Sequence, residues 1–190
     1  MSAPRNAVTV APETRLRAAR RPIQIAIGTL AVALAAQVSV PVPLSPVPMT
    51  LQPLAVLAVG GLLGAQGGVA SLVLYLALGI AGLPVFAGGS GGLIHVLGPT
   101  GGYLLAFPLA AGVVGALAGP TAGVLRVLLA CAVGMVVIHA GGVAQLAVIG
   151  GNPAAAFRLG FVPFLTGDLL KVGLAAAVIL AGRSLVRRSH

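Results

Sequence analysis

Residues 124–149 read VLRVLLACAVGMVVIHAGGVAQLAVI, an apolar stretch in which Arg126 is the only Lys, Arg, Asp or Glu. An α-helix needs about 20 predominantly apolar residues to cross the hydrocarbon core of a bilayer. This stretch meets that length with a single charge near one end, where a long side chain can reach the polar interface. The segment therefore predicts a membrane-spanning helix.

The composition of the whole chain agrees with a membrane environment. Of its 190 residues, 58% are hydrophobic and 7% are charged, and the mean hydropathy is +1.11. A soluble domain carries roughly a quarter charged residues. A chain of this length cannot hide so much apolar surface in one core, so we predict an all-α membrane protein.

Glycine and proline divide the apolar sequence into about six segments. We expect membrane spans at residues 23–40, 51–64, 67–81, 103–117, 124–149 and 162–182. The second and third are short, so one of them could be partly re-entrant. The predicted fold is a bundle of about six transmembrane helices with long outward-facing loops. It forms a single domain over residues 22–190, after a basic and mobile cytoplasmic tail over residues 1–21.

Basic residues at both ends of the chain indicate its orientation. Arginines precede the first span and follow the last one: Arg5, Arg15, Arg17, Arg20, Arg21, Arg183, Arg187 and Arg188. Cytoplasmic segments are enriched in Lys and Arg, and six spans place both termini on one side. We therefore expect both termini in the cytoplasm. No nucleic-acid partner is expected, because the basic residues form no groove with interleaved aromatics.

This topology assigns a side to each connection. Residues 41–50, 82–102 and 150–161 should face outward, and tight glycine-rich turns near residues 64–68 and 119–123 should face inward. A cleaved signal peptide is an alternative, since Ala33-Leu34-Ala35 follows a basic start and an apolar stretch. Cleavage there would leave five spans and place the arginine-rich C-terminus outside, against the charge rule.

Asp168 and Lys171 are the distinctive residues of the last predicted span, about two turns from its outward end. Asp168 is the only acidic residue after Glu13, and Lys171 is the only lysine. A charge within a spanning helix costs about 2.5–3.5 kcal/mol on insertion scales, so each group needs a partner or a cavity. The spacing of three places both on one helical face, which Phe164 and Phe161 extend. Rings, a carboxylate and an ammonium together suit an amphipathic small molecule; the alternative is a purely structural ion pair.

Two outward connections could complete such a site. Residues 82–102 read GLPVFAGGSGGLIHVLGPTGG, which is long, apolar and rich in glycine, and glycine allows close approach of backbone to a ligand. Residues 41–53 are stiffened by proline and could form a second wall or lid. Ordinary turn chemistry is the alternative for both segments.

The remaining polar residues are less informative. His95 lies in the glycine-rich connection and could contact a ligand, whereas His139 is expected to bond a neighbouring backbone group. Arg158 could steer an anion or contact a lipid head group. The histidines and Cys131 have no metal-ligand spacing, so neither a metal nor a cofactor is expected. The sequence has no G-x-x-x-x-G-K-[ST] motif and no arrangement of catalytic residues, so we predict no enzyme activity.

Four motifs resemble a known family. They are PVPMTLQPL (residues 46–54), LGIAGLPVFAGGSGG (78–92), GPTGGYLLAF (98–107) and PFLTGDLLK (163–171). Their sequence and order are similar to those of BioY, the biotin-specific S component of energy-coupling-factor (ECF) transporters. The resemblance covers nearly the whole chain after the N-terminal tail.

The resemblance implies a function and a set of functional residues. The family has six transmembrane helices, binds biotin near the outer face, and works with a transmembrane coupling protein and two ABC ATPase subunits. The resemblance therefore implies a multi-pass protein of a prokaryotic cell (inner) membrane. Biotin would then be the transported ligand, with Lys171 for its carboxylate and Asp168 for its ureido N–H groups. The substrate-binding set expected from the motifs is Asp168, Lys171, Phe164, Tyr103, Phe86, Thr100 and Gln52. Ala31 and Ala35 resemble the small-residue pair with which S components contact the coupling protein.

Two other functions remain as alternatives to a biotin-binding S component. A self-sufficient secondary transporter for a small organic anion would often show internal repeats and further midplane polar groups, and neither is evident in the sequence. A membrane enzyme or a scaffold is disfavoured by the absence of a catalytic set and by the polar stripe around Asp168.

Overall fold

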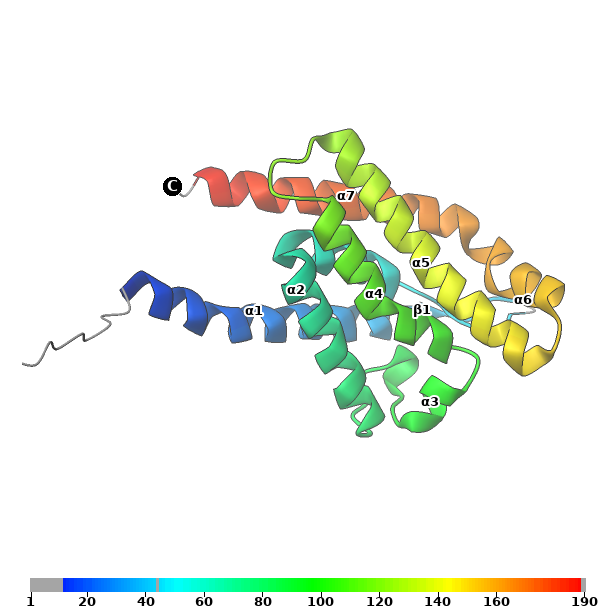
Figure 1. Ribbon diagram of the computed structural model, residues 1–190. Coiled ribbons are helices and arrows are strands. Elements are labelled where there is room, and N and C mark those ends of the chain that lie inside the picture. Colours follow the sequence, from blue (N-terminus) through cyan, green and yellow to red (C-terminus); the bar gives the residue numbers. More distant parts are fainter. Residues whose placement is uncertain (1–11, 44, 189–190) are drawn as a thin grey trace, which may run out of the picture.

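The structure is a computed structural model that describes residues 12–43 and 45–188, and it is mostly helical (Figure 1). Its helices are α1 (Pro12–Gln37), α2 (Gln52–Ile80), α3 (Leu93–Leu97), α4 (Gly101–Leu117), α5 (Val124–Gly150), α6 (Pro153–Gly160) and α7 (Leu165–Arg188). Two short 3-10 turns, η1 (Ala87–Gly89) and η2 (Val162–Phe164), and the two-residue strands β1 (Ser39–Val40) and β2 (Met49–Thr50) complete the described elements. The start of α1 and the end of α7 project from the same side, and α3 and α6 lie toward the other side (Figure 1).

Helix α2 consists of two helical arms that meet at Gly64. The backbone of Gly64 has φ 72° and ψ 175°, which interrupts a helix and is readily adopted by glycine. A Cβ atom on Gly68 would lie 2.9 Å from the Cα atom of Gly60, so the arms approach each other backbone to backbone. The expected spans 51–64 and 67–81 are these two arms, and the expected turn at residues 64–68 is reduced to a break at Gly64.

The helical segments correspond to the six predicted spans. These segments are α1, the two arms of α2, α4, α5 and α7. By length and composition, the stretches Gln52–Ile80, Val124–Gly150 and Pro153–Leu185 could cross a membrane, and Gly101–Leu117 is a shorter apolar helix. The predicted all-α bundle of about six spans is therefore confirmed.

The N-terminal boundary differs from the expected tail. Helix α1 begins at Pro12, so residues 12–21 are helical, whereas the sequence predicts a mobile tail there. The earlier residues, including Arg5, lie outside the described part of the chain. Pro22 lies inside α1 and has no backbone N–H to donate, but the helix continues past it to Gln37.

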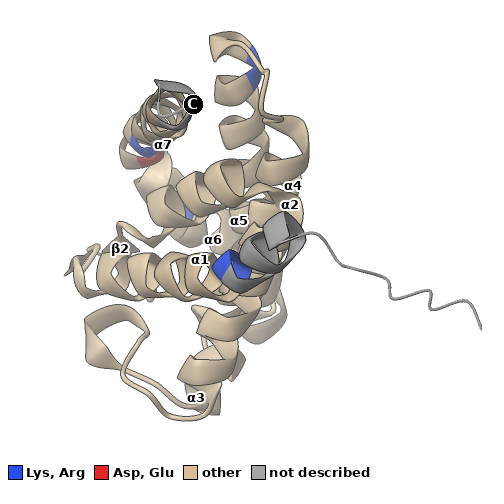
Figure 2. Cartoon of the chain, turned by 90° about the vertical axis from the view of Figure 1, so that its left-hand side faces the viewer, with Lys and Arg blue, Asp and Glu red and all other residues tan. Residues whose placement is uncertain are grey.

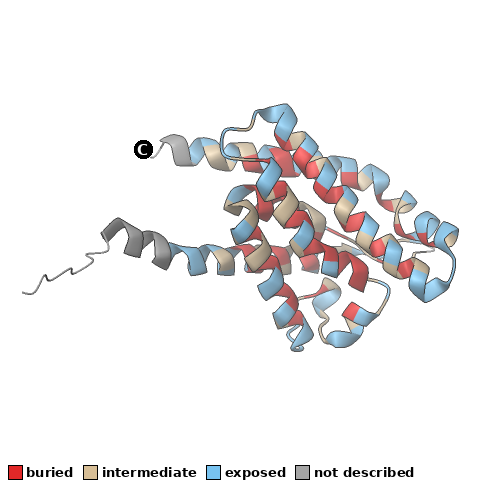
Figure 3. Cartoon of the chain, viewed as in Figure 1, coloured by how far each residue is buried: buried red, intermediate tan, exposed pale blue. Residues whose placement is uncertain are grey.

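Exposed residues lie along the outer faces of the helices (Figure 3), and many of them are large and apolar. Leu109, Leu125 and Leu170 are 66%, 70% and 65% exposed, respectively. Charged residues are sparse on the described chain (Figure 2). Soluble monomers rarely expose large contiguous apolar patches, so this surface is suited to lipid.

Buried residues lie mainly where the helices face one another (Figure 3). Val32, Leu57, Tyr75, Ile138 and Ile179 are at most 1% exposed and come from four different helices. Helix α4 packs against both α2 and α5, and α7 packs against the same two helices. This central packing holds the polar residues of α5 and α7 at fixed positions.

The first two connections that were expected to face outward are ordered. In the first, β1 and β2 pair antiparallel, with Ser39 opposite Thr50. The second contains η1 and α3 and is tied to α2, since the backbone N–H of Gly92 donates to the carbonyl of Gly79 over 2.7 Å. Gly92 has φ 100°, a conformation that favours glycine.

The third connection that was expected to face outward is helical in large part, as α6 shows. Helix α6 begins after Asn152, whose Oδ1 accepts a hydrogen bond from the backbone N–H of Ala155 over 3.0 Å. Pro153 occupies the first helical position. An asparagine cap followed by proline is a common helix start, and this local signal explains why the segment folds as a helix.

Candidate functional site: a polar triad in an aromatic cavity

A cavity of about 310 Å³ lies between α2, α4, α5 and α7, with walls from the first two connections. Its volume falls within the range of about 300–1,000 Å³ that is typical of small-molecule sites. The structure brings all seven predicted substrate-binding residues to its lining: Gln52, Phe86, Thr100, Tyr103, Phe164, Asp168 and Lys171. Their role in binding stays a prediction.

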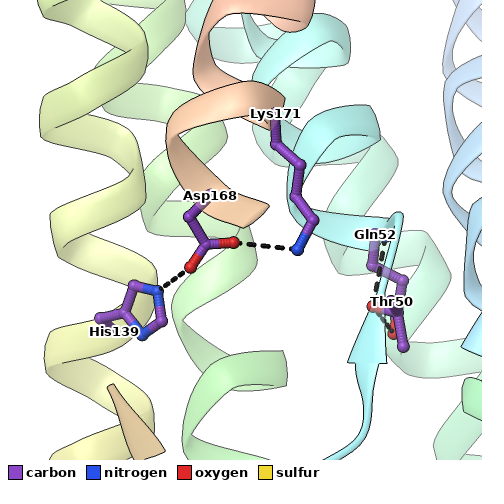
Figure 4. Close-up of polar contacts among 5 residues, drawn as sticks. All are labelled: Thr50, Gln52, His139, Asp168 and Lys171. Carbon is purple, nitrogen blue, oxygen red and sulfur yellow. Dashed lines mark hydrogen bonds and ion pairs between the residues drawn. The ribbon is translucent and has the colours of Figure 1, made fainter. Parts of the chain in front are cut away.

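Three ionisable side chains form a chain of contacts at one wall of this cavity (Figure 4). The Nζ atom of Lys171 donates to Oδ1 of Asp168 over 2.9 Å, and Nε2 of His139 lies 2.6 Å from Oδ2. The three residues are 5–7% exposed. Burial of this kind requires paired charges, and each carboxylate oxygen of Asp168 has its own partner.

The position of Asp168 in its helix favours the ionised carboxylate. Asp168 lies in the first turn of α7, which begins at Leu165, and not two turns inside the span as expected. A negative charge near a helix N-terminus is stabilised by the unpaired backbone N–H groups and the helix dipole. Lys171 lies one turn further along the same face and extends toward the side of the cavity where Gln52 lies (Figure 4).

His139 has a different role from the one expected, because it pairs with a side chain on another helix. Its partner is Asp168, not a backbone group of α5. Its ring meets the rings of Phe161 and Tyr103 edge-on, at centroid distances of 5.0 and 6.0 Å, and the ring of Phe164 at 6.1 Å. An ionisable residue inside a membrane span is a functional candidate by default. The position of His139 within the apolar segment 124–149 was therefore the signal in the sequence that could have identified it.

The predicted helical face of Phe161, Phe164, Asp168 and Lys171 includes one residue, Phe161, that does not share it. Phe164 lines the cavity, but Phe161 is absent from its lining and packs on His139 and Phe157. The physical reason is a break in helical phase, since Phe161 has φ −123° and ψ −56° between α6 and η2. The i, i+3, i+4 pattern therefore holds from Phe164 onward only.

A second polar network forms the facing wall. Nε2 of Gln52 donates to the Tyr75 hydroxyl over 2.7 Å, and that hydroxyl donates to the carbonyl of Val85 over 3.0 Å. The Thr50 hydroxyl donates to Oε1 of Gln52 over 3.1 Å. These bonds join β2, both arms of α2 and the second connection, so Gln52 stabilises the wall in which it lies.

The other predicted residues support the aromatic walls. The Tyr103 hydroxyl donates to the carbonyl of Gly160 over 2.6 Å, which ties α4 to the end of α6. The Thr100 hydroxyl donates to the carbonyl of His95 over 3.2 Å. Phe86 is 2% exposed and lies edge-on to Tyr75 at 5.5 Å. The cavity is thus apolar along most of its surface and charged at one place.

Several lining residues gave no distinctive signal in the sequence. His95 lies in the predicted glycine-rich connection and lines the cavity, which is also lined by the apolar residues Val47, Pro48, Leu104, Phe107 and Ile138. Within the described residues, no group of three or more His, Cys, Asp or Glu side chains is arranged to hold a metal ion.

The remaining candidates lie outside this cavity. Arg158 is exposed on α6, and Nε of Arg126 donates to the carbonyl of Leu117 over 2.8 Å. Ala31 and Ala35 are half-buried on α1 and pack against the core. A contact of these alanines with another subunit stays a prediction.

A second cavity, of about 330 Å³, lies at the other ends of α4 and α7. Its lining is mostly glycine and leucine, with Arg183 as the charged residue among the described residues that form it. The Arg183 guanidinium donates to the carbonyl oxygens of Gly61 and Ala118. These carbonyls lie at or near the ends of helical segments, where backbone acceptors need partners.

Comparisons with known proteins agree with this architecture. The sequence profile of the BioY family matches residues 7–188. A probable biotin transporter BioY from Pyrococcus horikoshii is 45% identical over 149 residues, which cover 78% of this chain and 85% of the relative. The biotin transporter BioY of Thermotoga maritima is 38% identical over 161 residues, covering 85% of this chain and 94% of the relative.

A solved structure is similar over nearly the whole chain. It is a crystal structure of the S-component for biotin from an ECF-type ABC transporter, with a TM-score of 0.82 and 27% sequence identity. The superposition covers 90% of this chain and 93% of that chain. The profile match, the level of identity and the shared fold together show that this chain belongs to the BioY family.

Proposed function

We propose that this protein binds biotin in the aromatic cavity and mediates biotin uptake as the S component of an ECF-type ABC transporter. The observation that carries the proposal is the buried pair of Asp168 and Lys171 at one wall of an otherwise apolar cavity. The named functions of the relatives from P. horikoshii and T. maritima, and of the similar S-component, support biotin as the ligand.

The chemistry of biotin matches the groups in the cavity. Biotin has a carboxylate on an apolar chain and a ring system with ureido N–H donors. The Lys171 ammonium has three N–H donors, and one of them is used by Asp168, so the others can bind the ligand carboxylate. Each carboxylate oxygen has two acceptor positions, so Asp168 can accept from ureido N–H groups while it keeps its present partners.

Energy for uptake would come from other subunits. The sequence contains no G-x-x-x-x-G-K-[ST] motif for binding ATP phosphates. We therefore propose assembly with a transmembrane coupling protein and two ABC ATPase subunits. Ala31 and Ala35 would be part of the contact surface on α1, next to the exposed side chains of Ile27 and Leu34. This role requires that a partner helix approach α1 closely beside its packed face.

The proposed orientation places both termini in the cytoplasm of a prokaryotic cell. The basic residues at both ends of the sequence and the common side of the described ends support it (Figure 1). Cysteine placed at Arg5 or at Ser189, both outside the described residues, should resist membrane-impermeant thiol reagents in intact cells. Labelling of either cysteine from outside would contradict this topology.

Binding and uptake assays would test the function. The purified protein should bind biotin, and cells that need external biotin should take it up efficiently when the coupling subunits are also present. The alternative, a self-sufficient secondary transporter for a small organic anion, predicts equal uptake with and without those subunits. Absence of biotin binding by the purified protein would overturn the proposed ligand.

A further inference from the structure

We propose that His139 is a positioning residue for biotin binding, which acts through Asp168 to keep the Lys171 ammonium available to the ligand carboxylate. The inference rests on the proposed function and adds a residue from α5 to the two charged residues of α7. The geometry assigns this role through the contact of 2.6 Å between Nε2 of His139 and Oδ2 of Asp168.

The partners of Asp168 determine which nitrogen of His139 carries a proton. Asp168 is held as a carboxylate, since the Lys171 ammonium donates to its Oδ1. An ionised carboxylate has acceptors only. The 2.6 Å contact is therefore a hydrogen bond donated by Nε2–H of His139, a charge-assisted type that is stronger than a bond between neutral groups.

The other ring nitrogen of His139 cannot serve the ligand. Its Nδ1 atom is buried and has no hydrogen-bond partner among the described residues. The rings of Tyr103, Phe161 and Phe164 surround the imidazole. A buried N–H without a partner is costly, so this setting favours the tautomer with its proton on Nε2. With one nitrogen bonded to Asp168 and the other enclosed, His139 acts through Asp168.

The effect on the ligand follows because His139 and Lys171 bind different oxygens of the Asp168 carboxylate. His139 donates to Oδ2 of Asp168. Lys171 donates to Oδ1, which is the acceptor of the ammonium among the described residues. Without the donor from His139, the Lys171 ammonium would be the remaining side-chain donor to Asp168 among the described residues. The ammonium would then bind Asp168 more closely and bind the ligand carboxylate less well. His139 thus limits the competition between the protein carboxylate and the ligand carboxylate for Lys171.

Two substitutions at His139 separate this role from simple packing. His139→Met removes the donor but keeps an apolar side chain of similar reach. His139→Gln keeps an N–H donor at a position close to that of Nε2. The control is Thr29→Val, which removes the buried hydroxyl that donates to the carbonyls of Ile25 and Ser71, away from the cavity.

The measurement is the affinity of each purified variant for biotin and for neutral biotin amide. Coupling between groups in one network is typically about 0.5–3 kcal/mol, so His139→Met should weaken biotin binding by about 2- to 150-fold. The amide, which lacks the carboxylate charge, should lose much less affinity. His139→Gln should recover most of the biotin affinity, and Thr29→Val should bind as the wild type does.

The results that would contradict this inference differ from the result that would contradict the proposed function. Equal losses for biotin and its amide in His139→Met, or failure of His139→Gln to recover binding while it is folded, would overturn the positioning role. An equal loss in Thr29→Val would show that general destabilisation is the cause and would also overturn it. Absence of biotin binding by the wild type would contradict the proposed function itself, whereas normal binding by His139→Met contradicts this inference alone.

Discussion

The two cavities of this bundle have similar volumes, about 310 and 330 Å³, but their walls differ. The first has aromatic walls and a carboxylate that holds an ammonium on one side and an imidazole on the other. The second has walls of glycine and aliphatic residues, and its guanidinium donates to backbone carbonyls. Volume alone therefore does not distinguish a ligand site from a gap between helix ends.

The difference lies in what each cation is bound to. Arg183 satisfies carbonyls of the helical segments around it, so its hydrogen bonds stabilise the fold. Among the described residues, the Lys171 ammonium is paired with the Asp168 carboxylate and keeps further N–H donors beside the apolar walls of the cavity, so it can bind a ligand. The rigid aromatic side chains around Lys171 supply apolar contact area, which the glycines of the second cavity cannot supply.

The largest expected effect comes from unbalancing the charges of the first cavity. Asp168→Asn leaves the Lys171 ammonium buried without a counter-charge, which typically costs about 3–5 kcal/mol when a buried pair is broken. The thermal stability of the purified protein should fall accordingly. Adding Lys171→Met should restore much of the stability but leave biotin binding weak, because the double variant has neither charged group.

The double variant also decides between the ligand-binding and the structural role of the pair. A structural ion pair could be replaced by neutral residues with little effect on binding. Wild-type affinity for biotin in the folded double variant would therefore contradict a ligand-binding role for Asp168 and Lys171.

A smaller effect is expected from filling space behind the aromatic wall. A Cβ atom on Gly79 would clash with the Phe86 ring, whereas one on Gly119, in the second cavity, would meet nothing within 4 Å. Gly79→Ala should therefore destabilise the protein by about 1–3 kcal/mol, as overpacking does, and weaken biotin binding. Gly119→Ala should change stability by less than about 0.5 kcal/mol. Equal effects of the two substitutions would contradict the difference between the cavities.

The smallest effect on ligand affinity is expected on α1. Ala31→Leu or Ala35→Leu should weaken assembly with the coupling subunits, because a larger side chain prevents close approach of a partner helix. Neither residue lines the cavity, so biotin affinity should stay within about twofold of the wild type. Co-purification of the complex measures assembly, and normal complexes with both replacements would exclude this contact surface.

The charged residues of the site were predictable because the sequence offers so few of them. Asp168 and Lys171 are rare ionisable groups in an apolar chain, and the cost of burying them requires a partner or a cavity. Their spacing of three gave the shared face directly. The partnership with His139 was not predictable in the same way, because it depends on how α5 and α7 pack across 29 residues of sequence.

The spans were predictable for a similar physical reason. Hydropathy and length decide which segments cross a bilayer, and they located α4, α5 and both arms of α2. The short helix α6 was missed because its residues lack the length of a span, although Asn152 and Pro153 form a recognisable helix start. The offset of Phe161 from the stripe was missed because a periodic pattern assumes an unbroken helix.

The measurement that tests the central claim most directly is a thermodynamic cycle in which a charge is removed from the protein, from the ligand, or from both. The affinities of the wild type and of Lys171→Met are measured for biotin and for biotin amide. A hydrogen bond to a charged group is worth about 1.5–3 kcal/mol, so Lys171→Met should lose about 10- to 150-fold in biotin affinity and little for the amide. Equal losses for the acid and the amide would contradict a direct contact between Lys171 and the ligand carboxylate.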